Sequence, residues 1–256
     1  MNYAIVAKKD PYSYQVEAIL KKTLDEAGWN YDKEHPSLVI CVGGDGTLLY
    51  AVHRYLNKIN EIRFLGIHTG TLGFFTDYTA EELEECIYDL LHKEPTVFAS
   101  KLLKVHLTKE NKSFYALNEM RVENVIKSQR VDIYIDDEFF ETCNGTGICL
   151  STQAGSTAYN RSLRGAVIDS GLSLLQLAEI TPIQHSKHRS LNNPYVMMDT
   201  RSIRMEGEFS DALLCYDHLH YCLDGMNTII CEMSDLEVHF ARYREYSYLK
   251  RLKNLY

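Results

Sequence analysis

The stretch at residues 38–47 constrains the fold of this chain more than any other. It reads Leu-Val-Ile-Cys-Val-Gly-Gly-Asp-Gly-Thr, and apolar residues at helical spacing follow it directly. A strand that ends in glycines lets the backbone approach a ligand closely, because glycine accepts positive φ and has no Cβ. Phosphate is the usual ligand of such a turn, since the first amides of the following helix have no partner within that helix.

Asp45, at the centre of the turn, adds chemistry to this binding pattern. A carboxylate repels a phosphate unless a cation lies between them or the acid takes a proton from a hydroxyl nucleophile. The turn therefore indicates phosphoryl transfer more than binding alone. The alternative is an ordinary tight turn with Asp45 capping the next helix, but a cap needs no second and third glycine. The motif is neither a Walker loop nor a GxGxxG dinucleotide fingerprint.

The first part of the chain alternates strands and helices. Apolar runs predict strands at 3–7, 38–42 and 62–67, and helical spacing follows at 14–27, 47–56 and 79–92. Thr79 and Glu82 form a capping-box pattern at the start of the third helix. Three such alternations imply a three-layer α/β domain with a parallel sheet at residues 1–98.

The pattern of apolar and polar residues changes after Pro95. Short aromatic or β-branched runs broken by polar turns predict an all-β, sandwich-like domain at residues 99–239. The expected strands are 97–107, 114–124, 131–135, 139–143, 147–151, 195–198, 203–205, 212–216 and 228–233. A tail at 240–256, rich in Arg, Lys and Tyr, is expected to pack back on the first domain or on another subunit. No Gly/Ser linker separates the domains, so we expect the ligand site in a cleft between them.

Charge and cysteine content exclude several classes of partner. Because the chain carries a net charge of −8, we do not expect it to bind nucleic acid or an anionic membrane by sequence-independent electrostatic attraction. The seven cysteines are scattered and form no zinc-like spacing, which is typical of buried small hydrophobic residues. The first apolar run is too short for a signal peptide or a membrane span, so we expect a cytoplasmic protein.

Later polar groups are weaker candidates for a site. Asn118 and Glu119 close an apolar strand and could bind two ribose hydroxyls, although a solvated turn fits the spacing as well. The small, hydroxyl-rich segments 145–147 and 151–159 could hold a flat ligand or simply cap a helix. The histidines of 185–188 and 217–220 lack zinc-site spacing and fit solvated loops. Arg161 and Arg164 could reach phosphate, but a solvated helix face is the commoner reading.

Taken in order along the chain, these residues resemble the NAD kinase family. The 43–47 motif alone is shared with lipid kinases of the diacylglycerol and sphingosine type and, more loosely, with phosphofructokinases. The further anchors are His-Thr-Gly-Thr-Leu-Gly-Phe at 68–74, Asn-Glu at 118–119, the 151–159 segment and Thr-Pro-Ile at 181–183. Together they extend over most of the chain, from residue 38 to residue 245.

The resemblance implies an enzyme that phosphorylates the adenosine-ribose 2′-hydroxyl of NAD to give NADP. ATP or polyphosphate would be the donor, with Mg²⁺ or another divalent cation and no dedicated protein metal ligands. Family members have an N-terminal α/β domain and a C-terminal β domain, hold NAD between them, and assemble as homo-oligomers, so a homodimer or homotetramer is expected.

The resemblance also implies roles for individual residues. Asp45 matches the family's base, and Phe74 is similar to the residue at the adenine end of the dinucleotide. Asn118 and Glu119 look like the adenosine-binding pair, and Asp217 stands where an acid often lies near nicotinamide. The remaining expected ligand-binding residues are Gly43, Gly44, Gly46 and Thr47 for the donor phosphates, and Thr146, Ala154, Thr157, Ala158 and Tyr159 for NAD.

Three departures from the family pattern affect NAD recognition rather than the phosphate turn. Thr146 stands where an acid usually helps to hold the dinucleotide, sometimes across a subunit boundary. Ala154 replaces a common Thr or Ser, and Gln153 a common Pro. Two other functions fit the motifs: a lipid kinase, which the acidic charge and the Asn118 and Tyr159 anchors disfavour, and an NAD-binding sensor without catalysis, which Thr146 would permit.

Overall fold

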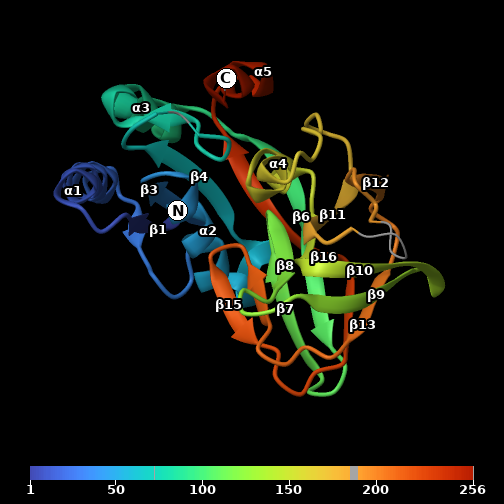
Figure 1. Cartoon of the computed structure of the whole chain (residues 1–256). Helices are drawn as coiled ribbons and strands as arrows, with labels where there is room; N and C mark the ends of the chain where they lie inside the picture. Colours follow the sequence, from blue (N-terminus) through green and yellow to red (C-terminus); the bar gives the residue numbers. More distant parts are fainter. Residues whose placement is uncertain (72, 185–189, 256) are drawn as a thin grey trace. The chain divides into compact units, whose positions relative to one another are not determined.

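The structure, a computed structural model, describes residues 1–71, 73–184 and 190–255. Figure 1 shows the whole chain coloured along the sequence. The chain divides into two compact units. Unit 1 comprises Met1–Ser100 together with Leu236–Tyr256, and unit 2 comprises Lys101–Asp235. Unit 1 is therefore built from two segments that are distant in sequence.

Unit 1 contains a parallel sheet with the order β2-β1-β3-β4 and the end of β16 beside β4. The central strands pair in register along their length, with Ile5 beside Ile40 and Ile40 beside Leu65. Because parallel strands end at the same edge, the turns that follow β1, β3 and β4 come together. The strands are β1 Asn2–Ala7, β2 Asn30–Tyr31, β3 Leu38–Val42, β4 Arg63–His68 and the short β5 Tyr78–Thr79.

Helices cover this sheet because both of its faces are apolar. Leu20 and Leu24 of α1 pack with Leu90 of α3 against Tyr3 and Ile40. The alternate strand residues, such as Val39 and Cys41, are also buried, and α2 lies against β1, β3 and β4. The helices are α1 Pro11–Glu26, α2 Asp45–Arg54, α3 Leu83–His92 and α5 Tyr248–Leu252, with short 3-10 segments η1 Leu56–Glu61, η2 Ala80–Glu82 and η4 Lys253–Leu255.

Two helix starts show why these segments fold locally. The Asp10 side chain accepts a hydrogen bond from the Ser13 amide, and Pro11 occupies the first position of α1. The capping box predicted for Thr79 and Glu82 is present in both directions. This confirms the predicted start of the third helical segment.

Unit 2 consists of antiparallel strands around a second core. The long strand β10 pairs with β9 over its first half, and with β8 and β11 over its second half. It thereby joins both sets of strands into one continuous sheet, and Val122, Leu214, Ile133 and Ile229 from the two sets share one hydrophobic core. Two of its strands continue into unit 1, because β6 begins there and β16 ends there. The strands are β6 Thr96–Leu107, β7 Lys112–Ala116, β8 Glu119–Glu123, β9 Gln129–Ile135, β10 Glu138–Ser151, β11 Leu174–Pro182, β12 Tyr195–Met198, β13 Ile203–Gly207, β14 Leu213–Tyr216, β15 Leu219–Cys222 and β16 Thr228–Arg242.

The expected fold class is confirmed, while several element boundaries differ. The predicted strand 114–124 is two strands, because the chain turns at Leu117 and Asn118 between β7 and β8. The two strands predicted at 139–151 are one continuous strand. Strands β11 and β15 were not predicted, and the short helical turns η3 Ala154–Thr157 and α4 Tyr159–Ser162 follow β10. Among the described residues, no helix is long and apolar enough to cross a membrane.

Candidate functional site

The glycine-rich turn of unit 1 leaves no room for a side chain at its first glycine. Gly43 has φ of 153°, and a Cβ there would lie 2.2 Å from Thr47 Oγ1. Its amide donates to the Ile67 carbonyl at 2.9 Å, which ties the end of β3 to β4. Helix α2 begins at Asp45, so the free amides of its first turn face the same edge of the sheet as this glycine turn.

The Asp45 carboxylate is held by the loop that follows β4. Oδ2 accepts from the Phe74 amide at 2.9 Å, and Oδ1 accepts from the Phe75 amide at 3.0 Å. Gly73 permits this contact, because a Cβ on it would lie 2.3 Å from Oδ1. Helix α2 has no side-chain cap, so the alternative in which Asp45 only caps the helix is wrong. Each carboxylate oxygen keeps lone-pair capacity for a further donor.

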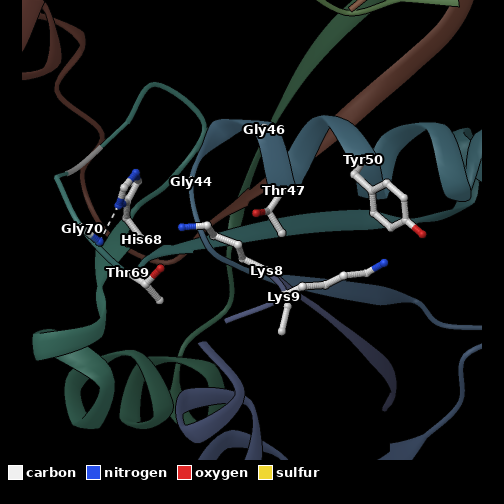
Figure 2. Close-up of a pocket in the computed structure, with 10 residues that line it drawn as sticks. Lys8, Lys9, Gly44, Gly46, Thr47, Tyr50, His68, Thr69 and Gly70 are labelled. Atoms are coloured by element: carbon white, nitrogen blue, oxygen red, sulfur yellow. Dashed lines mark hydrogen bonds between the residues drawn. The ribbon is translucent and has the colours of Figure 1, made fainter. Parts of the chain in front are cut away.

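A pocket of about 570 Å³ lies beside this turn, and Figure 2 shows the side chains around it. Lys8 and Lys9 follow β1, and Tyr50 comes from the second turn of α2. Backbone amides at a helix start, two ammonium groups and the Thr47 hydroxyl suit phosphate oxygens. We call this the phosphate pocket; its lining residues are Ala7, Lys8, Lys9, Gly44, Gly46, Thr47, Tyr50, His68, Thr69 and Gly70.

His68 enters the phosphate pocket as a neutral group. Its Nδ1 accepts a hydrogen bond from the Gly70 amide at 2.7 Å, drawn in Figure 2, so the proton of the neutral ring is on Nε2. Burial lowers the pKa of His68 below its ordinary value. Nε2 lies 3.2 Å from the position that a Cβ of Gly44 would occupy. The imidazole therefore presents a donor to the glycine turn without adding a charge.

Several residues of the phosphate pocket were missed by sequence reasoning. Lys8, Lys9 and Tyr50 belong to no motif, and His68 was noted only as part of the 68–74 anchor. The available signal was topological: β1 and β3 are parallel neighbours, so the residues after β1 must lie beside the glycine turn. Phe74, expected at the adenine end, is half-buried, and its ring meets that of Tyr248 edge-on at 5.7 Å.

In unit 2, Asn118 and Asp217 are joined through the backbone. The Asp217 carboxylate accepts from the Leu117 amide at 2.9 Å and from the Asn118 amide at 2.8 Å. Asp217 itself has φ of 49° in the tight turn between β14 and β15. The structure thus brings together two of the expected NAD-binding residues that are 99 positions apart in the sequence.

Glu119 is a buried acid with an unusual environment. Its side chain is 5% exposed, and Oε2, like Asn118 Oδ1, has no hydrogen-bond partner among the described residues. Burial, and then the nearby charge of Asp217, raises the pKa of Glu119 to about 7. Buried polar atoms without partners are rare in folded proteins, and a bound hydroxylated ligand would satisfy both of these. At neutral pH the Glu119 carboxyl can donate as well as accept.

The 151–159 segment packs against Asn118 and Glu119. The Thr152 hydroxyl donates to the Leu117 carbonyl at 2.6 Å. A Cβ on Gly155 would lie 2.0 Å from the backbone carbonyl oxygen of Asn118, so the chain passes closely here. The Tyr159 backbone hydrogen-bonds Glu119, and its hydroxyl donates to Glu123 Oε1 at 3.0 Å. Asn118, Glu119, Tyr159 and Asp217 therefore form one cluster, which we call the carboxyl cluster.

The other expected NAD-binding residues are distributed differently. Ala154, Thr157 and Ala158 are partly exposed in the turn that leads to Tyr159. Thr146 is not in the carboxyl cluster: Ser151 of β10 pairs with Glu119, and Thr146 lies five positions earlier, roughly 16 Å along the strand.

The remaining weak candidates stay outside the carboxyl cluster or outside the described part of the chain. His218 and His220 are both exposed, but only His218 lies in a turn as expected, because His220 belongs to strand β15. Leu72 of the 68–74 anchor and the histidine segment 185–188 lie outside the described residues.

The described residues contain no group of three or more His, Cys, Asp or Glu side chains that could hold a metal ion. Asp45 is the acid of the glycine turn, and it begins the helix whose first turn borders the phosphate pocket.

Comparison with known proteins identifies the family. Residues 7–95 match the ATP-NAD kinase N-terminal domain, and residues 116–242 match the ATP-NAD kinase C-terminal domain. The NAD kinase of Lactobacillus gasseri is 35% identical over 260 residues, covering 100% of this chain and 97% of that protein. NAD kinase 1 of Oceanobacillus iheyensis is 36% identical, covering 99% and 97%.

Solved structures share the fold. The structure of yeast NADH kinase complexed with NADH matches with a TM-score of 0.83 at 19% identity, covering 100% of this chain and 87% of that one. An NAD kinase from Archaeoglobus fulgidus in complex with ATP matches with a TM-score of 0.76 at 24% identity, covering 100% and 97%. The NAD kinase activity expected from the sequence is confirmed by the curated relatives, and no comparison supports the lipid kinase or the sensor. With both family domains matched and relatives aligned along its whole length, the chain belongs to the NAD kinase family of enzymes.

Proposed function

We propose that Asp45 is the general base that accepts the proton of the adenosine-ribose 2′-hydroxyl as NAD is phosphorylated. The observation that carries this proposal is the fixed orientation of its carboxylate by the Phe74 and Phe75 amides, in the turn that opens onto the phosphate pocket. A base must be positioned before its proton affinity matters. Two amide donors provide that orientation and leave an oxygen lone pair for the substrate hydroxyl.

The phosphate pocket is the proposed donor site. The amides at the start of α2, the Lys8 and Lys9 ammonium groups and the His68 Nε2–H would bind the phosphates of ATP or polyphosphate. Charge builds on the phosphoryl oxygens and the leaving group during transfer, and fixed donors stabilise it. A divalent cation bound with the donor, Mg²⁺ in our proposal, would neutralise part of the same charge, with Asp45 as the neighbouring carboxylate.

The carboxyl cluster is the proposed binding site for the adenosine part of NAD. Asn118 Oδ1 and Glu119 Oε2 are the buried atoms without partners that ribose hydroxyls would satisfy. Tyr159 contributes the face of its aromatic ring, and the ring is held in place because its hydroxyl donates to Glu123. Ala154, Thr157 and Ala158 would border the ligand, and Asp217 would act mainly by holding the Asn118 backbone.

We also propose that copies of the chain associate with one another and that the protein is cytoplasmic. Phe140 of β10 stacks on Tyr195 of β12 at 5.4 Å, and Phe139 and Met198 nearby in these strands are 55% and 57% exposed. Exposed apolar groups of this kind suit a contact between copies of the chain, as a homodimer or homotetramer. All seven cysteines are free, as expected in a reducing compartment. Light scattering on a sizing column would show a monomer if the assembly proposal is wrong.

The Asp45→Asn variant tests the proposed base directly. It keeps one oxygen for the loop amides and removes the proton acceptor, so NADP formation from NAD, ATP and Mg²⁺ should fall roughly 10²–10⁴-fold. Glu84→Gln, on the exposed side of α3, is the matched acid-to-amide control and should retain full activity. An unchanged thermal midpoint would show that Asp45→Asn remains folded, and near-normal NADP formation by it would rule Asp45 out as the base.

A further inference from the structure

The end of unit 1 reaches the loop that holds Asp45. Arg251 of α5 is 4% exposed, and its guanidinium donates from Nε to the Gly73 carbonyl at 3.1 Å. Its Nη2 donates to the Thr76 carbonyl at 2.7 Å. One planar group thus joins the two ends of a four-residue turn, a geometry that the fork of arginine suits and a lysine cannot reproduce.

Tyr246 binds the middle of the same turn. Its hydroxyl donates to the Phe74 carbonyl at 2.9 Å. The guanidinium of Arg251 lies over the Tyr246 ring, with Cζ 3.9 Å from its centre. Arg251 is itself anchored, because Nη1 donates to the Ser247 carbonyl at 3.0 Å. The two side chains therefore form a single support that is anchored at the start of α5.

Two of these contacts, to the Gly73 and Phe74 carbonyls, are made to peptide groups that also contact Asp45. The Gly73–Phe74 peptide accepts from Arg251 through its carbonyl and donates to Asp45 through its amide. The Phe74–Phe75 peptide accepts from Tyr246 and donates to Asp45. Because a peptide group is planar and rigid, fixing its carbonyl fixes the direction of its N–H. A donor at the carbonyl also polarises the amide and strengthens the bond that the amide gives.

We propose that Arg251 and Tyr246 are positioning residues for catalysis, acting through these two peptide groups on the Asp45 carboxylate. The inference rests on the proposed role of Asp45 as the base. It extends the catalytic apparatus to the end of unit 1, beyond residue 242, where the family's domain match stops. A purely structural role would instead lower stability without acting through Asp45.

Tyr246→Phe tests the proposal with the least disturbance, because it removes one hydroxyl and keeps the ring under Arg251. We expect kcat to fall roughly two- to tenfold, the worth of one net hydrogen bond, with KM for NAD and ATP changed less than twofold. Arg251→Lys keeps the charge but loses the fork, and should lower kcat by about tenfold or more. Lys250→Ala, on the exposed side of the same helix, is the control and should leave kcat unchanged.

A double-mutant cycle with Asp45→Asn separates positioning from stability. If Tyr246 acts through the carboxylate, Tyr246→Phe should cost less than twofold in kcat when Asp45 is already Asn. Equal losses in both backgrounds, or no loss in either, would overturn the inference. Amide hydrogen exchange at Phe74 and Phe75, followed by NMR, gives a readout independent of activity: faster exchange in Tyr246→Phe is expected, and unchanged exchange would contradict the proposed support.

The same experiments distinguish failure of this inference from failure of the proposed function. An active Asp45→Asn enzyme would remove the base assignment, and with it the reason for a positioning role. An inactive Asp45→Asn enzyme combined with a fully active Tyr246→Phe enzyme would keep the base and remove only the positioning role.

Discussion

Replacing Gly73 by alanine should displace the Asp45 carboxylate without touching Asp45 itself. The added Cβ would lie 2.3 Å from Oδ1 and 2.7 Å from Cγ, whereas ordinary contacts begin near 3.4 Å. The carboxylate would have to move by about 1.1 Å, because the main chain on the other side is held by Arg251. A misplacement of about 1 Å commonly costs on the order of 10² in rate, equivalent to about 2.7 kcal/mol of barrier.

The assay is steady-state NADP formation with NAD and ATP each varied. We expect kcat to fall about a hundredfold and both KM values to change little, because the substitution does not touch the lining of the phosphate pocket or the carboxyl cluster. Strain on the two amide contacts should lower the thermal midpoint by a few degrees. Thr71→Ala, exposed in the same loop, is the control. A lowered midpoint with unchanged kcat would refute the reasoning, since the carboxylate would then work equally well in another place.

Four further predictions concern binding and pH. Because the folded state holds the Glu119 proton up to about pH 7 and the unfolded chain releases it near 4.5, the free energy of unfolding should fall as pH rises through this window, and urea titrations of Glu119→Gln should lack that component. NAD affinity, measured calorimetrically without donor, should vary between about pH 6 and 8 in the wild type and be flat in Glu119→Gln; a flat wild type would contradict the assignment. Burial is the main cause of the raised Glu119 pKa, and Asp217→Asn removes the charge that adds to it. The midpoint of that pH dependence should therefore move to lower pH, and an unmoved midpoint would exclude Asp217 as a cause. Lys8→Ala should raise KM for ATP roughly tenfold and leave KM for NAD unchanged, while Lys22→Ala, exposed on α1, should change neither; an unchanged KM for ATP would remove Lys8 from the donor site.

Local signals predicted the elements of unit 1 well because each is specified by neighbouring residues. Strand β3 is five buried apolar residues, and the capping box of Thr79 needs only Glu82 three positions on. The β-rich part was less predictable. The run at 174–182 is largely buried on both faces, and Gln176 and Glu179 interrupt its apolar residues, so it has neither a clear twofold nor a clear helical period, and β11 was missed.

The chemistry of the site was predictable only where a motif carried it. Asp45 stands in a recognisable turn, but the partners of its carboxylate depend on how the loop after β4 crosses the sheet edge. That crossing needs Gly66, where a Cβ would lie 2.6 Å from the Phe75 carbonyl. Arg251 and Lys8 lie in stretches without any motif, and tertiary structure alone brings them to the site.

The return of β16 to unit 1 has a consequence for how this protein is made. His239 and Phe240 pair in parallel with Arg63 and Phe64, and α5 follows them. During synthesis, the first hundred residues leave the ribosome with the outer edge of β4 unpaired at Arg63 and Phe64, since β5 pairs only with Ile67 and His68, and with the Asp45 loop lacking Arg251. The edge is covered only after all of unit 2 has been synthesised, a long-range closure that is slow by its nature. Until then the nascent unit 1 exposes an open strand, the feature on which chaperones and misfolding both act.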